Sequence, residues 1–139
     1  MKWKKIENRY VISIGPGEKI IEQLNIFIEK EGIKNCSIVG IGACDWMDLA
    51  HYCPTDKDYT SQIIEKPMEI ANLTGNAFLV EGKPFVHLHI TAGNKNFETL
   101  SGHLNDARIS AACEIVLTVL NSKIGKKFSE EIGLNLLDL

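Results

Sequence analysis

The chain has 139 residues, of which 45% are hydrophobic and 24% are charged. This composition is typical of one folded globular domain, residues 1–139, and it excludes a disordered chain. The formal net charge of −3, from 15 basic and 18 acidic residues, does not support direct DNA binding, because phosphate neutralisation is served by a basic excess.

The first part of the chain predicts a strand, a helix and a long apolar strand. Residues 10–14 show an alternating pattern that includes β-branched side chains, which is typical of a strand. We expect a long helix over residues 18–31, because apolar residues recur there at helical spacing, and Gly32 is its expected stop. Residues 36–44 predict a buried strand whose two glycines indicate a bulge or a close backbone approach.

The rest of the chain predicts strands joined by turns, with Asp106 and Arg108 in a turn and residues 128–133 as one helical turn. The expected strands span 45–53, 58–66, 68–80 (with Gly75 as a candidate bulge), 85–91, 99–105, 111–120 and 134–139. Strands that follow one another through hairpins, with one long helix, indicate an α+β fold. We expect a strongly curled, largely antiparallel sheet packed by one long helix plus short helical turns.

Three of the four histidines, His87, His89 and His103, lie in one short segment. His87 and His89 are two residues apart in an expected strand, so their side chains share a face, with about 7 Å between them along the backbone. A hairpin loop centred on Asn96 would place His103 directly opposite His89, with about 5 Å between the Cβ atoms. A slip of one residue would turn His103 to the other face. The spacing therefore favours a metal site at these three histidines.

The chemistry of such a site has open alternatives. Three neutral imidazoles suit zinc, with a fourth position left for water, a carboxylate or a neighbouring subunit. The site could instead be structural, closed by Cys53 or Cys113, or the histidines could be ordinary strand residues.

Whether the chain is an enzyme stays open at this point. Catalytic zinc activates a water or polarises a carbonyl, and it needs a general base nearby. Glu98 in the hairpin loop and Glu114 on the following strand are candidates for that base, and Arg108 is a further candidate pocket residue. No substrate or reaction follows from these residues.

The sequence shows no transmembrane segment and no secretory signal, and these features bear on the expected cellular compartment. No apolar run approaches the roughly 20 residues of a transmembrane helix, so we expect no membrane partner. The N-terminal Met-Lys-Trp-Lys-Lys has no hydrophobic segment behind it, and the four cysteines form no C-x-x-C pair. We therefore expect a cytoplasmic protein.

Several motifs together resemble the PPC (or PCC) domain, a plants-and-prokaryotes domain that accompanies AT-hook motifs in plant nuclear proteins. The resemblance extends over nearly the whole chain, and its most specific part is H-x-H with a later G-H-L. The motifs are Arg9-Tyr-Val-Ile followed by Pro-Gly-Glu and the helix, Gly40-Ile-Gly-Ala43, Gly82-Lys-Pro-Phe-Val-His-Leu-His-Ile90, Gly102-His-Leu104, Glu114-Ile-Val-Leu117 and Glu131-Ile-Gly-Leu134.

The resemblance implies a compact α+β domain that assembles as a homotrimer. It also implies a zinc site at His87, His89 and His103. Prokaryotic members of the family are stand-alone domains, often described as predicted DNA-binding proteins. In the plant proteins the AT-hook contacts DNA, and this sequence has no such motif.

The alternative function is therefore a DNA-associated or protein-interaction module without its own AT-hook. In a trimer, Lys123, Lys126 and Lys127 could gather into a shared basic patch.

Overall fold

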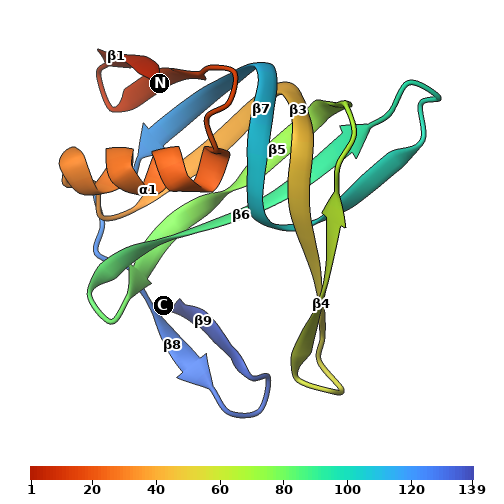
Figure 1. Cartoon of the computed structure of the whole chain (residues 1–139). Helices are drawn as coiled ribbons and strands as arrows, with labels where there is room; N and C mark the ends of the chain where they lie inside the picture. Colours follow the sequence, from red (N-terminus) through yellow and green to blue (C-terminus); the bar gives the residue numbers. More distant parts are fainter.

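The computed structural model describes residues 1–139 and consists of nine strands and one helix (Figure 1). In chain order these are β1 (Lys2–Ile6), β2 (Arg9–Ile14), α1 (Ile20–Lys30), β3 (Cys36–Cys53), β4 (Asp58–Ile64), β5 (Met68–Val80), β6 (Lys83–Gly93), β7 (Thr99–Val119), β8 (Gly125–Ser129) and β9 (Leu134–Asp138).

The sheet curls until it closes on itself. Strand β3 pairs with β5 and β7, and β6 pairs with the same two strands, so these four strands form a closed circuit. Strands β1 and β2 continue the sheet beyond β7, and β4 pairs with β3 alone. Every pairing is antiparallel except the short one between β5 and β8. The expected α+β class, with a curled and largely antiparallel sheet, is confirmed.

One hydrophobic core of 28 buried residues lies between the curled sheet and α1, which contributes four of them. Strand β2 illustrates the pattern, because Tyr10, Ile12 and Ile14 are buried while the residues between them are exposed. The close approach expected at the paired glycines is confirmed. A Cβ at Gly42 would lie 2.4 Å from the Ala112 carbonyl oxygen, and the β3 register shifts on both sides of this glycine.

The expectation of a long helix over residues 18–31 is wrong, because α1 has only 11 residues. The backbone of the segment before the helix pairs with β7 instead. The Glu18 carbonyl accepts the Ile109 N–H, and Lys19 forms an isolated antiparallel β-bridge with Arg108. Gly32 ends the helix as expected, with a positive φ of 65°. No helix in the structure is long and apolar enough to cross a membrane.

Three other expectations are corrected. Residues 36–53 and 99–119 form single long strands, so Asp106 and Arg108 lie within β7 and not in a turn. These two polar residues have partners within the fold and do not mark a turn. The Asp106 carboxylate accepts the Ile21 N–H at the start of α1, and the Arg108 guanidinium forms a salt bridge with Asp45.

The helical turn expected over residues 128–133 is shorter than predicted: the Gly133 N–H donates to the Ser129 carbonyl, which closes one turn, whereas Phe128 belongs to β8 and pairs with Asn135. The expected final strand over 134–139 is confirmed as β9, whereas β1 was not anticipated. Gly75 is in regular register and is not a bulge; the irregularity of β5 lies between Ile70 and Asn72.

Candidate metal centre

His87 and His89 on β6 and His103 on β7 form one cluster on the sheet. His89 pairs directly with His103, as the hairpin centred on Asn96 predicts. The ring centroids of the three imidazoles are 5.1–5.7 Å apart. One nitrogen from each ring lies within 4.8 Å of the other two. The three side chains are therefore close enough to hold one metal ion.

The turn between β6 and β7 fixes this register. The Asn94 side-chain oxygen accepts the N–H groups of Asn96 and Glu98, at 2.8 and 3.2 Å. The backbone N–H of Asn94 also donates to the Glu98 carbonyl, and Phe97 takes a positive φ of 63°. This side-chain-to-backbone bonding is typical of asparagine in turns. The turn length then decides that residue 103 faces residue 89.

A glycine on the neighbouring strand sets the position of His87. Gly75 of β5 pairs with Leu88 of β6, and a Cβ at this position would lie 2.0 Å from the His87 carbonyl oxygen. Only glycine permits the two backbones to approach so closely. The close approach fixes the strand segment from which His87 and His89 project.

The surroundings of the cluster keep two of its imidazoles neutral at pH 7. Burial lowers the pKa of His87 to about 4, with further lowering by Lys126 and the other two histidines. Burial also lowers the pKa of His103, with His89 and Lys126 adding to the effect. The buried His103 Nδ1 has no hydrogen-bond partner. Neutral imidazoles with free lone pairs are the donor set of a transition-metal ion, and the residues present therefore fit one.

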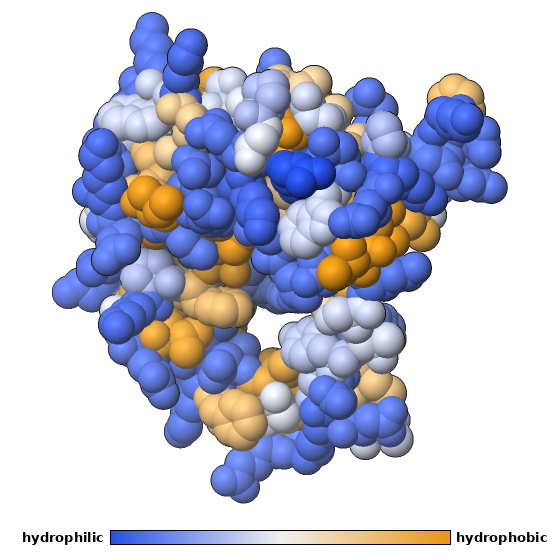
Figure 2. Space-filling model, viewed as in Figure 1, coloured by the Kyte–Doolittle hydropathy of each residue, from blue (hydrophilic) through white to orange (hydrophobic).

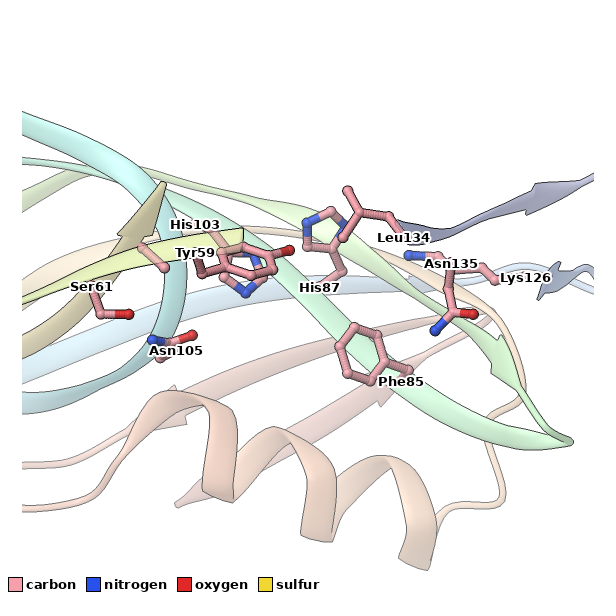
Figure 3. Close-up of a pocket in the computed structure, with 10 residues that line it drawn as sticks. Tyr59, Ser61, Phe85, His87, His103, Asn105, Lys126, Leu134 and Asn135 are labelled. Carbon is pink, nitrogen blue, oxygen red and sulfur yellow. The ribbon is translucent and has the colours of Figure 1, made fainter. Parts of the chain in front are cut away.

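Two pockets of about 390 and 640 Å³ adjoin the cluster and share His87 and His103. Figure 3 shows the smaller one, with the rings of Tyr59 and Phe85 facing it from β4 and β6 and Lys126, Leu134 and Asn135 reaching it from the C-terminal hairpin. In Figure 2 the molecule is hollowed between this hairpin and the body of the sheet. The histidines thus lie at the wall of a space large enough for a small molecule.

The other candidate site residues lie elsewhere. Glu98 is in the β6–β7 turn, where it accepts a hydrogen bond from the Asn94 side chain. Glu114 lies on the outer part of β7, opposite Ser13 and Ile41. The Arg108 guanidinium donates to Asp45 at 2.8 Å. None of the three lines either histidine pocket, so the fold does not bring them to the histidine cluster.

The cysteines and the fourth histidine are also outside the cluster. Cys113 is buried in the core, where burial raises its pKa to about 12, and Cys53 is half-buried at the end of β3. His51 is exposed at the rim of the larger pocket. The candidate ligand set therefore consists of imidazoles only.

Several pocket residues are not predicted as site residues by the sequence. Lys126 belongs to a basic group there, and Phe85 and Leu134 lie in motifs of the family resemblance that do not mark a pocket. The remaining polar and aromatic lining residues lie on strands without a motif: Tyr59, Ser61, Asn105 and Asn135. Only the pairing of distant strands brings them to the histidines.

The family model of the Plants and Prokaryotes Conserved (PCC) domain matches residues 1–121. The chain belongs to the PCC domain family. No curated protein sequence matches the chain. Three solved structures illustrate how closely this PCC domain follows its relatives.

A presumed DNA-binding protein from Bacteroides thetaiotaomicron is 36% identical, with a TM-score of 0.96 over 99% of this chain and 96% of that one. A PPC protein from Pyrococcus horikoshii is 27% identical, with a TM-score of 0.87 over 99% and 94% of the two chains. A metal-containing protein from Archaeoglobus fulgidus is 28% identical, with a TM-score of 0.87 over the full length of both.

The C-terminal hairpin of this PCC domain lies beyond the matched residues, yet it supplies three residues that line the smaller pocket. The Tyr52 hydroxyl donates to the Ile132 carbonyl, and the Lys57 ammonium donates to the Glu130 carbonyl at 2.6 Å. Both bonds join the β8–β9 turn to the β3–β4 hairpin, whose tips lie near each other in Figure 1. These two hydrogen bonds hold the C-terminal hairpin in the position from which Lys126 and Asn135 line the pocket beside the histidine cluster.

Proposed function

We propose that this PCC domain is a zinc-binding protein whose ion is held by His87, His89 and His103. One observation carries the proposal: three imidazole nitrogens from two paired strands lie within 4.8 Å of one another. A zinc ion bound by three histidines keeps a position open for a further ligand. The metal content of the Archaeoglobus fulgidus relative supports the assignment.

The chemistry at this site follows from the protein groups around it. Zinc, when bound, supplies a Lewis acid. The partly buried positions of His87 and His103 keep their imidazoles unprotonated at neutral pH, which favours metal binding over proton binding. No cysteine or carboxylate of this chain lies in the cluster, which favours a site open towards the pocket over a structural zinc centre closed by four protein ligands.

Elemental analysis tests the zinc proposal. The purified chain is incubated with Zn²⁺, desalted and analysed, and we expect one zinc per chain. His89→Ala should retain almost none, whereas His51→Ala, which removes a histidine outside the cluster, should retain one. Circular dichroism verifies that both variants fold. A wild-type protein that stays free of metal under these conditions would overturn the proposal.

We further propose a homotrimer, which an exposed apolar row on the outer sheet face supports. Val11, Val116 and Val39 are adjacent on β2, β7 and β3, and all three are exposed. Apolar side chains in such a row favour burial against another chain. Light scattering after size exclusion should give three times the 15.5 kDa chain mass. Val39→Lys should lower the measured mass, because it places a charge in the apolar row. A monomeric wild type would exclude the trimer.

A second candidate function is association with DNA, which the 36% identity to a presumed DNA-binding protein favours. The basic patch expected at Lys123, Lys126 and Lys127 is weakened by the fold, because Lys126 is half-buried in the histidine pocket. Fluorescence anisotropy with duplex DNA at low and moderate salt tests this function. Direct DNA binding should give an affinity that falls as the salt concentration rises. If no such binding is measured, DNA association by this chain is excluded and the zinc proposal is the remaining function.

A further inference from the structure

Lys126 has no anionic partner for its charge. It projects from β8 into the smaller pocket, where it is half-buried and lies 5.6 Å from the centroid of the Phe85 ring. Its ammonium group makes no hydrogen bond or salt bridge; the two salt bridges of the chain join other residues. Burial lowers the pKa of Lys126, as expected for a cation that has lost water without gaining an anion.

The pocket also has no negative group of its own. Neither of the two pockets at the histidine cluster is lined by an aspartate or a glutamate. The basic groups that face the space are one lysine and the histidines. An anion entering it would therefore meet attraction and no repulsion.

The other lining residues offer both polar and apolar contacts. The side chains of Ser61, Asn105 and Asn135 line the pocket and make no hydrogen bond within the protein. Tyr59 and Phe85 are 43% and 49% exposed, so their rings have free surface towards the space. Convergent polar groups on an apolar wall are typical of small-molecule sites, and about 390 Å³ is within their usual volume range.

From this arrangement we infer that the pocket binds a small organic anion, with its carboxylate or phosphate on Lys126 and its apolar part against Phe85 and Tyr59. This inference rests on the proposed function, because the anion would lie beside the zinc site. It adds the chemical class of the ligand to that function. The bond to Lys126 is a charge-assisted hydrogen bond, a stronger type of polar contact than a neutral one.

Benzoate, benzyl alcohol and inorganic phosphate serve as probes in titrations of the zinc-loaded protein followed by NMR. Benzoate should bind more tightly than benzyl alcohol, which has the same ring without the charge. Lys126→Met should weaken benzoate binding by about tenfold or more, and Lys126→Arg should restore most of it. Lys127→Met removes an exposed neighbouring charge on the same strand and should bind benzoate as the wild type does.

The outcomes separate this inference from the zinc proposal, because zinc content is measured for each sample. Lys126→Met that keeps its zinc but loses benzoate supports the inference, and tighter binding of phosphate than of benzoate assigns the anion to the phosphate class. Equal binding of benzoate and benzyl alcohol overturns it, and so does unchanged benzoate binding by Lys126→Met. Benzoate binding through Lys126 in a protein that takes up no zinc would sustain the anion site while the zinc proposal fails.

Discussion

His89 lies directly opposite His103 across the β6–β7 ladder, and the centroids of their imidazole rings are 5.7 Å apart. This pairing brings together the two strands that supply the cluster. It depends on the turn from Asn94 to Glu98, whose length sets the register. The candidate metal centre is thus controlled by residues that do not belong to it.

Replacing Asn94 with alanine should lower the free energy of unfolding by about 1–2 kcal/mol, because two backbone N–H groups lose their acceptor. Zinc affinity should fall with it, since a looser turn holds His103 less firmly opposite His89. Urea unfolding and zinc titration measure the two effects. Asn96→Ala is the matched control, because the Asn96 side chain makes no hydrogen bond, and equal losses in both variants would refute this role of Asn94.

Gly75→Ala should weaken both folding and metal binding. The added Cβ would lie 2.0 Å from the His87 carbonyl oxygen, so β5 and β6 must separate. We expect a loss of about 1–3 kcal/mol in the free energy of unfolding, the typical range of an overpacked site. Gly93→Ala on β6 meets nothing closer than 3.8 Å and should keep its stability and its zinc. Thermal unfolding and elemental analysis compare the two variants; a stable, zinc-replete Gly75→Ala protein would contradict the prediction.

The metal-free protein should lose stability as the pH falls from about 6.5 to about 4. The pKa of His87 is about 4 in the folded state and near its ordinary value of 6.5 when unfolded. In this window the unfolded chain binds the proton and the folded chain does not, so acid favours unfolding. Because His87 is half-exposed, we expect a loss of about 1–2 kcal/mol and not the full value of the shift.

Urea unfolding of metal-free protein at a series of pH values measures this loss. His87→Asn should flatten the pH dependence, whereas His51→Asn should leave it unchanged. A wild-type stability that is constant between pH 6.5 and pH 4 would be inconsistent with a neutral, half-buried His87.

Tyr52→Phe should loosen the C-terminal hairpin with little effect on the rest of the fold. The variant loses the hydrogen bond from its hydroxyl to the Ile132 carbonyl, and we expect about 1 kcal/mol less stability against local opening. Hydrogen exchange should therefore speed up in β8 and β9 alone. Tyr59→Phe is the control, because the Tyr59 hydroxyl makes no hydrogen bond; protection that is equal in the two variants would argue against the contact.

The sequence predicted the parts of the site that local rules control. The i, i+2 spacing of His87 and His89 in a strand puts them on one face. The turn-forming Asn94 segment between two apolar runs placed His103 opposite His89, and the register has this pairing. The alternating residues of β2 and the glycines of β3 also predicted local structure correctly. Burial of one strand face requires alternating apolar residues, and a close backbone approach requires glycine.

Long-range contacts set what the sequence did not predict. The helix is shorter than its apolar spacing indicates, because Glu18 and Lys19 bond to β7. Asp106 and Arg108 looked like turn residues, although their polar side chains have partners on α1 and β3. A polar residue with a distant partner and a polar residue in water look alike in a sequence.

The sequence by itself determined that three histidines on two paired strands share one face of the sheet, since the two-residue period of a strand and the length of a turn are local properties. Only the tertiary structure decided what surrounds them. The β8–β9 hairpin reaches the pocket through its contact with the β3–β4 hairpin, and it carries Lys126 to a place without a counter-ion. Such a juxtaposition depends on how the closed sheet brings distant segments together, and no local pattern encodes it.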